Sequence, residues 1–216
     1  MTILITNKQV LAHRGVWTDL AGQPILPKNS IDAIIRAKDL GFGLETDLRD
    51  QFGNLVISHD VPIVEAPVVN MDLLRGFMGP LALNVKSDGL IKLINDQVSM
   101  DEALEIFFFD MSVPEERQYA KASLPFASRV SEYESGVAEG ASWIWLDAFE
   151  SDWYLASESK VADLLAMKKK IAVVSPELHG RDMLDCWKLL ARLMREHTNL
   201  HLCTDFPELF INIHGA

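Results

Sequence analysis

Short apolar runs alternate with longer amphipathic segments from one end of the chain to the other. Each short run has the length and composition of a buried strand, whereas each longer segment repeats apolar residues at helical spacing. This alternation is typical of parallel strands joined by crossover helices. Eight strands are expected, at Gln9–Ala12, Gly43–Leu48, Leu81–Lys86, Ile106–Asp110, Phe126–Val130, Trp143–Asp147, Ile171–Ser175 and Leu200–Thr204.

Helices are expected in the connections between these strands. Ile31–Leu40 has Ser30 placed to cap its start and Gly41 placed to end it. The most regular apolar stripe predicts a helix over Met183–Glu196. Further helices are expected at Gly89–Asp96, Pro114–Ala122, Tyr133–Glu139 and Ser159–Lys169, with a short final helix after Pro207.

Eight strand-then-helix units predict a (β/α)8 barrel that occupies residues 1–216 as a single domain. At 216 residues the chain is short for this fold, so its loops must be short, and an open doubly wound sheet is the alternative. Gln51–Asn54 is a polar turn, and Leu55–Ser58 leaves it as a second β-like run. The chain is therefore expected to turn back after the second strand and to bring His59 near that strand.

The composition narrows the range of partners. There are 31 acidic residues and 20 lysines and arginines, so a formal net charge of −11 gives no broad attraction for nucleic acid or an anionic membrane. Met1–Val10 lacks a basic opening before an apolar run, and no segment has the roughly 18 apolar residues of a membrane span. A cytoplasmic protein without stable membrane insertion is expected. Cys186 and Cys203 have no metal or redox spacing and are interpreted as buried free thiols, and the oligomeric state is not indicated.

Polar residues stand where several strands are predicted to end. In a (β/α)8 barrel the carboxyl ends of the strands form the catalytic mouth. Glu45 and Asp47 are two apart on one strand, so their side chains share a face and repel each other unless a cation lies between them. Their oxygens suit Mg²⁺ or Ca²⁺. An ion-pair network with Arg14 or Arg49 is the alternative interpretation.

Two histidines stand beside this carboxylate pair. His13 and His59 can divide the roles of general base and general acid, whereas the other four histidines, His179 among them, are interpreted as structural or surface residues. Arg14 offers a fork of donors for phosphate oxygens, and Lys86 offers a point charge.

Later strand ends supply further candidates. Arg129 can bind an anionic group of the substrate, and Trp145 either stacks on the substrate or packs in the core. Asp110, Asp147 and Glu177 are possible additional carboxylate ligands, or ordinary capping and salt-bridge residues.

Four motifs follow one another early in the chain, at Leu11–Gly15, Pro27–Ser30, Leu44–Asp47 and Gly53–Asp60. Together they resemble the signature of the glycerophosphodiester phosphodiesterase family, and Cys203–Pro207 resembles the family's closing strand more weakly. The resemblance implies a metal-dependent phosphodiesterase of lipid metabolism on a (β/α)8 barrel. It assigns proton transfer to His13 and His59, the divalent cation to Glu45 and Asp47, and the phosphate to Arg14.

Two positions depart from the family pattern. The family has glutamate where this chain has Lys28 and Asn84, and the second of these glutamates is a metal ligand. The Asn84 carbonyl can still bind a cation, with weaker affinity or a different preference among cations. The resemblance implies a small-molecule phosphodiester substrate, hydrolysed to an alcohol and a phosphomonoester. A phospholipase D-like lyase that gives a cyclic phosphate and a non-catalytic phosphodiester-binding barrel are the alternatives.

Overall fold

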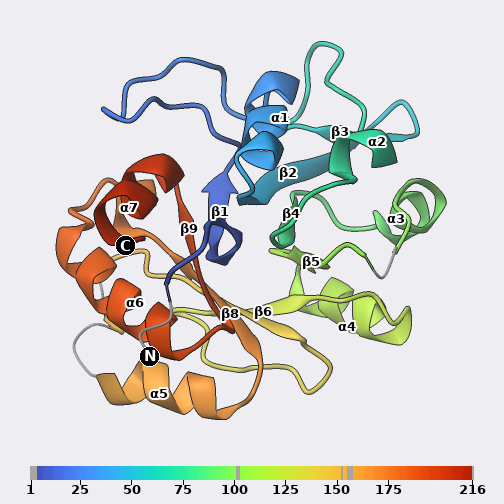
Figure 1. Ribbon diagram of the computed structural model, residues 1–216. Helices are drawn as coiled ribbons and strands as arrows, with labels where there is room; N and C mark the ends of the chain where they lie inside the picture. Colours follow the sequence, from blue (N-terminus) through green and yellow to red (C-terminus); the bar gives the residue numbers. More distant parts are fainter. Residues whose placement is uncertain (1–3, 101–102, 152, 155–157, 216) are drawn as a thin grey trace.

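The computed structural model describes residues 4–100, 103–151, 153–154 and 158–215, and within these residues parallel strands curve into a barrel (Figure 1). The barrel strands are β1 Val10–His13, β2 Gly43–Gln51, β4 Leu81–Val85, β5 Ile106–Phe109, β6 Ala127–Val130, β7 Trp143–Leu146, β8 Lys170–Val174 and β9 Leu200–Thr204. Their order is β5-β4-β2-β1-β9-β8-β7-β6. A parallel bridge between Phe108 and Phe126 closes the ring, and the Phe108 N–H donates to the Pro125 carbonyl at 3.0 Å. The predicted (β/α)8 barrel is confirmed, and the open sheet is wrong.

Helices surround the barrel, as Figure 1 shows. They are α1 Ile31–Asp39, α2 Met71–Leu74, α3 Ile91–Gln97, α4 Val113–Lys121, α5 Glu158–Ala166, α6 Leu184–Glu196 and α7 Pro207–His214, with short 3-10 helices at Asn7–Gln9 and Pro176–His179. The predicted cap of α1 is present, because Ser30 Oγ accepts a hydrogen bond from the Ala33 N–H at 3.2 Å. Gly41 follows this helix with a φ of 76°, a conformation that glycine adopts without strain.

One predicted helix is wrong. Tyr133–Glu139 is irregular chain between β6 and β7. Local bonds take the place of helical ones there: the Ser131 N–H donates to the Glu134 carbonyl at 2.7 Å, and the Ala138 N–H donates to Ser128 Oγ at 3.0 Å. The segment contains Gly136 and few apolar residues, so it has no stripe to bury against the barrel.

The predicted turn after β2 is confirmed. β3 Asn54–Ile57 pairs antiparallel with β2, and the register places Leu48 opposite Ile57 and Gln51 opposite Asn54. The pairing extends β2 to Gln51, beyond its expected end at Leu48. It also returns the chain to the mouth of the barrel, where His59 follows β3.

Aromatic side chains fill the barrel interior. Because side chains alternate along a strand, Phe107 and Phe109 of β5 point inward while Phe108 packs outward against Tyr119 of α4. Phe107 stacks on Trp143 with ring centroids 4.2 Å apart. Small residues complete the interior, with Ala82, Ala127, Ala172 and Cys203 in the same inner cluster. This matching of large and small side chains fills the barrel without a pore.

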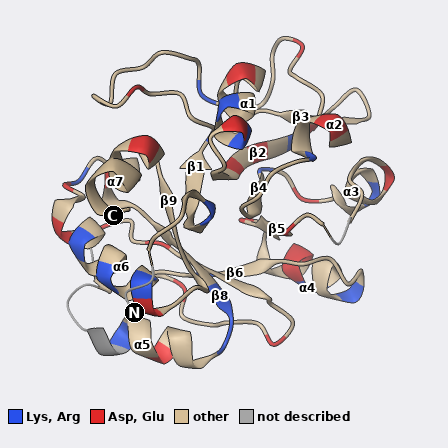
Figure 2. Ribbon diagram, viewed as in Figure 1, with Lys and Arg blue, Asp and Glu red and all other residues tan. Residues whose placement is uncertain are grey.

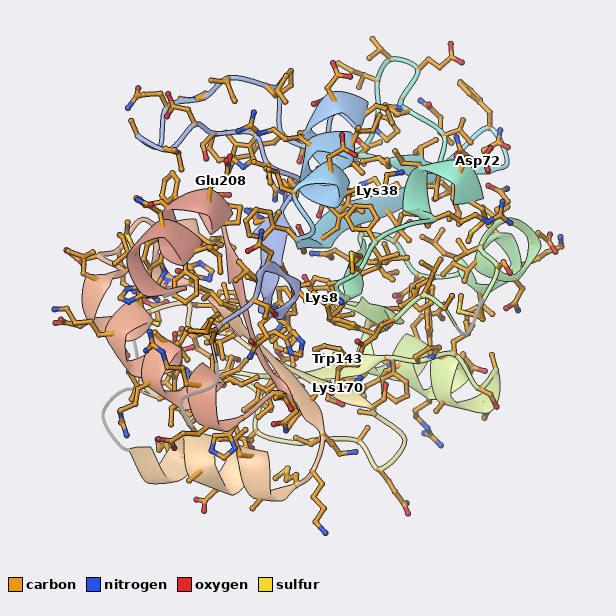
Figure 3. The ribbon with its side chains drawn as sticks, viewed as in Figure 1. Lys8, Lys38, Asp72, Trp143, Lys170 and Glu208 are labelled. Carbon is orange, nitrogen blue, oxygen red and sulfur yellow. The ribbon has the colours of Figure 1, made fainter. Side chains whose placement is uncertain are left out.

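Side-chain contacts link the outer helices. Lys38 of α1 donates through Nζ to the Leu73 carbonyl at 3.1 Å and reaches the Asp72 carbonyl of α2 (Figure 3). Arg36 of α1 pairs with Glu208 of α7 at 2.6 Å. Figure 2 shows charges of both signs on helices such as α1, α4 and α6. Cys186 and Cys203 are buried and form no disulfide with each other. No helix within the described ranges is long and apolar enough to span a membrane.

His201 of β9 is buried at the end of the barrel away from the mouth. Its ring lies 4.8 Å from that of Trp143, and no described residue forms a hydrogen bond with its Nδ1. Burial lowers the pKa of His201 to about 4, with a small opposing contribution from the charge of Glu105 and a small lowering contribution from Lys170. The folded protein therefore resists protonation of this ring.

This burial predicts a pH dependence of stability. The folded pKa lies below the unfolded value of about 6.5, so the contribution of this ring to the free energy of unfolding is constant above that pH and falls as the pH drops toward 4. The loss from this ring amounts to at most about 3.5 kcal/mol, at about 1.4 kcal/mol per pKa unit. We expect His201→Phe to flatten this part of the curve, measured by urea unfolding at several pH values. His197→Gln, on a partly exposed position, should leave the slope unchanged, and an unchanged slope in His201→Phe would contradict the prediction.

Candidate active site

A cavity of about 280 Å³ opens at the carboxyl ends of the barrel strands. It is lined by His13, Arg14, Glu45, His59, Asn84, Lys86, Phe109, Asp110, Arg129, Trp145, Asp147, Phe149, Val174, Leu178 and His179. Most of the residues proposed from the sequence therefore lie together, although they come from strands across the whole chain. Phe109 and Trp145 stack with ring centroids 3.9 Å apart and form an apolar part of this lining.

His13 ends β1 and is held by a carboxylate. Its Nδ1 lies 2.6 Å from Asp205 Oδ1, and its Nε2 lies 3.9 Å from Glu45 Oε2. Since the Asp205 carboxylate accepts the proton of Nδ1, Nε2 is the nitrogen that remains for chemistry. Burial lowers the pKa of His13 below its ordinary value, and the hydrogen bond and charge of Asp205 partly oppose this.

Asp205 has three donors around it. Besides His13, Lys28 Nζ lies 3.0 Å from its Oδ2, and Trp17 Nε1 donates to its Oδ1 at 3.3 Å. Lys28 also lies over the Trp17 ring, 4.2 Å from the centroid. Burial alone raises the pKa of Asp205, but the hydrogen bond with His13 and the charges of His13 and Lys28 outweigh it and lower that pKa. Asp205 is therefore a permanent anion beside His13.

Glu45 and Asp47 form a buried carboxylate pair on β2. The pKa of Glu45 is raised to about 8, first by burial and then by the charge of Asp47. Asp47 accepts a hydrogen bond from Asn29 Nδ2 at 2.8 Å. Two cations also contact it: Arg14 Nε lies 3.0 Å from Oδ2 and Lys86 Nζ lies 3.3 Å from Oδ1, as ion pairs without hydrogen-bond geometry. The ion-pair alternative drawn from the sequence is thus present around Asp47 through Arg14.

The oxygens of this pair can accommodate a divalent cation. Asp47 Oδ1 and Asn84 Oδ1 are both buried, and neither accepts a hydrogen bond from a described residue. Asp47 and Asn84 are register partners on β2 and β4. Oxygen donors of this kind are the ligands that Mg²⁺ and Ca²⁺ prefer. Within the described ranges no three His, Cys, Asp or Glu residues group as metal ligands. The oxygens that Glu45, Asp47 and Asn84 can offer come from two carboxylates and one amide.

His59 lies in a more exposed setting than His13. Its side chain is 44% exposed, and its Nδ1 contacts Asp60 Oδ1 at 2.9 Å, where Asp60 is 93% exposed. Arg49 donates through Nε to its backbone carbonyl at 3.1 Å and so anchors the loop rather than the ring. His59 lines the cavity together with His13 and also lines a neighbouring groove of about 500 Å³ that runs past Val61, Ile63 and Val64.

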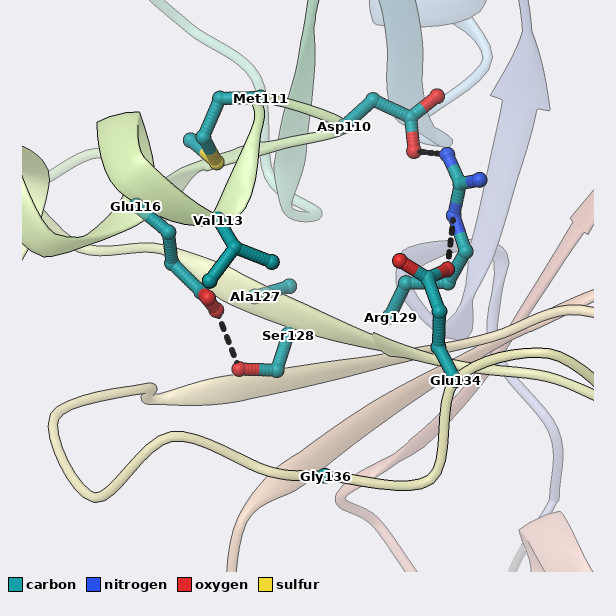
Figure 4. A pocket seen from close by; sticks show the side chains of 9 residues that line it. All are labelled: Asp110, Met111, Val113, Glu116, Ala127, Ser128, Arg129, Glu134 and Gly136. Atoms are coloured by element: carbon teal, nitrogen blue, oxygen red, sulfur yellow. Dashed lines mark hydrogen bonds and ion pairs between the residues drawn. The ribbon is translucent and has the colours of Figure 1, made fainter.

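The residues predicted to bind substrate, Lys86, Arg129 and Trp145, lie on the walls of the cavity. Lys86 Nζ is 3.8 Å from Asp110 Oδ2, and Arg129 pairs with the same carboxylate. Figure 4 shows Asp110, Arg129 and Glu134 at the edge of an adjoining pocket of about 320 Å³. Asp110 is therefore engaged by two cations and does not replace the missing carboxylate at Asn84. Trp145 both packs in the core and lines the cavity.

The turn after β1 depends on one glycine. Gly15 has a φ of 89°, and a Cβ at this position would lie 2.7 Å from the Ala33 carbonyl carbon. Any larger residue would push α1 away from β1. Arg14, which precedes it, also has a positive φ of 59°, and its N–H donates to the Glu45 carbonyl at 2.8 Å. The turn thereby ties Arg14 to β2.

His179, which the sequence indicates to be a structural or surface residue, lines the same cavity as His13. It contacts Asp147 Oδ1 through Nε2 at 2.8 Å. Its place after β8 was a usable signal, because the segment Pro176–His179 follows a strand that ends at the mouth. Arg181, two residues after His179, donates to the carbonyls of Ala148 and Phe149.

Three solved structures that superpose on this chain are described as phosphodiesterases. A glycerophosphodiester phosphodiesterase from Agrobacterium tumefaciens superposes with a TM-score of 0.68 at 17% identity, covering 97% of this chain and 100% of the other. One from Thermotoga maritima superposes at 0.64 and 16% identity, covering 97% and 99%. An Oleispira antarctica phosphodiesterase in complex with the product sn-glycerol-3-phosphate superposes at 0.66 and 16% identity, covering 97% of both chains. At these identities the comparison establishes the shared fold over nearly the whole chain.

Sequence comparison gives no such likeness. No protein-family profile and no curated protein sequence matches the chain.

The His13–Asp205 contact predicts a measurable change in titration. Asp205→Asn removes the charge and weakens the hydrogen bond that support the protonated ring, so the pKa of His13 should fall further. The measurement is an NMR titration of the histidine rings in the presence of a chelator. Asp72→Asn, an exposed carboxylate on α2, serves as the control and should leave His13 unchanged. Identical His13 titrations in Asp205→Asn and the parent protein would contradict this account of the pair.

Proposed function

We propose that this chain is a divergent member of the glycerophosphodiester phosphodiesterase family, and that it hydrolyses a small phosphodiester to an alcohol and a phosphomonoester. The observation that carries the proposal is the His13–Asp205 pair, 2.6 Å long, in a cavity that also holds cations and carboxylates at the mouth of the barrel. The fold shared with phosphodiesterases supports it, as does the product sn-glycerol-3-phosphate bound by the Oleispira antarctica protein.

Arg14 and Lys86 are the residues that we propose for the phosphate. The contact of Arg14 with Asp47 uses Nε, so its terminal Nη groups are the atoms that would bind phosphate oxygens. Lys86 would add a point charge at the same place. Arg129 and Trp145 would contact the rest of the substrate from the opposite part of the lining. Charge on the phosphate oxygens in the transition state would be stabilised by these fixed cations.

His13 and His59 are the residues that we propose for proton transfer. One imidazole would take the proton of the attacking oxygen as its bond to phosphorus forms, and the other would protonate the alcohol oxygen as its bond to phosphorus breaks. Nε2 of His13 is the atom in position for this, because Asp205 holds Nδ1. His59 would act from the loop after β3. Its side chain is 44% exposed, so the ring has room to turn toward the substrate.

Glu45, Asp47 and Asn84 would hold a divalent cation, Mg²⁺ or Ca²⁺. Two buried oxygens without hydrogen-bond donors among the described residues support this assignment. When bound, the cation would supply positive charge beside the phosphoryl oxygens. It would also stabilise the charged form of Glu45, which burial and Asp47 disfavour.

Histidine substitution tests the proposed activity. His13→Ala and His59→Ala should each lower kcat by about a hundredfold to ten-thousandfold, because each removes a proton-transfer group. The assay is alcohol release from a panel of glycerol, sugar and choline phosphodiesters, with magnesium, calcium or chelator.

Folding and product analysis complete this test. Circular dichroism should show unchanged folding, and His197→Ala, outside the cavity, should keep full activity. Phosphorus NMR of the products would distinguish hydrolysis from release of a cyclic phosphate. Wild-type protein that binds phosphodiesters and turns over none would replace the proposal with a binding barrel.

Position 84 gives a test of cation binding that is independent of turnover. Asn84→Asp adds a third carboxylate at nearly the same volume, so Mn²⁺ or Ca²⁺ should bind about tenfold more tightly or better. The measurements are isothermal titration calorimetry and the rise in Tm with added cation. Asn54→Asp, at the exposed first residue of β3, is the matched control. Equal cation affinity in Asn84→Asp and the parent protein would remove Asn84 from the ligand set.

A further inference from the structure

The cavity contains a second histidine–aspartate pair. His179 Nε2 lies 2.8 Å from Asp147 Oδ1, and the two side chains are 24% and 8% exposed. Asp147 directly follows β7 and His179 ends the 3-10 helix after β8, so both stand at the mouth of the barrel. Both residues line the cavity that holds His13.

The surroundings of Asp147 fix the orientation of the His179 ring. Asp147 Oδ1 also accepts a hydrogen bond from the Ala148 N–H at 2.8 Å, and the Asp147 carbonyl accepts one from Trp153 Nε1 at 3.0 Å. A carboxylate held in this way keeps its imidazole partner in one orientation, whereas the solvent-exposed pair of His59 and Asp60 is screened. His179 is thus an oriented imidazole that the proposed mechanism leaves without a task.

Nδ1 is the nitrogen of His179 that remains for a ligand. Asp147 accepts the proton on Nε2, so Nδ1 of the neutral ring is a hydrogen-bond acceptor, and no described residue donates to it. Phe149 lies beside it, with ring centroids 5.3 Å apart and an edge-on angle of 67°. Arg129 lies over the same Phe149 ring at 5.3 Å. An acceptor next to a flat apolar ring fits an alcohol that offers both hydroxyl and C–H groups.

We infer that His179, positioned by Asp147, binds a free hydroxyl on the alcohol portion of the substrate and selects polyol or sugar phosphodiesters over those of simple alkyl alcohols. This inference rests on the proposed phosphodiesterase function and names its substrate class. His179 contacts the substrate directly, whereas Asp147 acts through the imidazole. The groove past Val61 and Ile63 shares Arg14 and His59 with the cavity but contains neither His179 nor Asp147, so this selectivity depends on the side of the cavity formed after β7 and β8.

The test compares two substrates that differ only in hydroxyl groups. One is the p-nitrophenyl ester of glycerol 3-phosphate, and the other is the p-nitrophenyl ester of n-propyl phosphate. His179→Phe should lower kcat/KM for the glyceryl ester about tenfold or more and leave the propyl ester unchanged, because only the first loses a hydrogen bond. The loss should fall on KM, since the hydroxyl contact is made equally in bound substrate and transition state.

Two further variants guard against a purely structural effect. His179→Gln keeps a donor and an acceptor and should retain part of the preference for the glyceryl ester. His197→Phe, outside the cavity, should retain all of it. If His179→Phe does not fold, the comparison of His179→Gln with the parent protein provides the measurement, and a fully unchanged preference would then overturn the inference.

The outcomes separate this inference from the proposed function. Equal losses on both esters, or no loss on either, would overturn the role of His179 while leaving the phosphodiesterase in place. If wild-type protein hydrolyses neither ester, the proposed function fails. Calorimetry with sn-glycerol 3-phosphate and n-propyl phosphate then tests His179 alone. Tighter binding of the glyceryl ligand that is lost in His179→Phe would support the hydroxyl site, and equal binding of both ligands by the wild type would reject it.

Discussion

Strand alternation inside a closed barrel is the constraint on which the rest of this structure depends. Every second side chain points inward, and the space is filled by Phe107, Phe109, Trp143 and Trp145 packed among small residues. The upper stack, Phe109 on Trp145, is also part of the cavity lining. Apart from His201 at the opposite end, the polar inward-facing residues described above lie at the mouth, on one side of this apolar layer, where they contact each other.

That placement explains the electrostatics of the site. Burial raises the pKa of Glu45 and lowers that of His13, and in both cases the neutral form is favoured. Neighbouring side chains then stabilise the charged form of particular groups. Asp205 stabilises the protonated form of His13, whereas Arg14 and Lys86 contact the Asp47 carboxylate. The cavity therefore holds groups poised between charged and neutral states, which is the condition that proton transfer to and from a phosphodiester requires.

Lys28 and Asn84, the departures from the family pattern, can now be interpreted through their neighbours. Lys28 pairs with Asp205 and so adds a cation beside the His13 pair. Asn84 leaves Asp47 with less negative charge nearby, and Asp47 is contacted by two protein cations. Both changes make the site more positive than the family pattern would be. In the proposed function, they would favour an anionic substrate held largely by protein groups and a cation that binds less tightly than in a site with three carboxylates.

In the proposed function, the two sides of the cavity would bind different parts of the substrate, the phosphate and the alcohol. The part contributed by β1, β2 and β4 carries the cations, carboxylates and His13, which suit the phosphoryl group. The part contributed after β6, β7 and β8 carries Arg129, Phe149 and His179, which suit an alcohol with polar and apolar faces. Residues suited to the phosphoryl group, which all phosphodiesters share, thus lie on different strands from residues suited to a particular alcohol.

The sequence by itself determined the strands, most helices and most of the residues that meet at the mouth of the barrel, because these follow from local periodicity and from short motifs around His13, Glu45 and His59. It failed for Tyr133–Glu139, where turn bonds and the hydroxyl of Ser128 replace a helix, and it did not indicate that His179 lines the cavity. Only the tertiary structure decided the pairing of His13 with Asp205 and of His179 with Asp147. Those partners are 192 and 32 residues apart, and they meet only when the barrel closes. The pattern of residues along the chain predicts which way a side chain points. The residue that this side chain contacts depends on which strands become neighbours in the barrel.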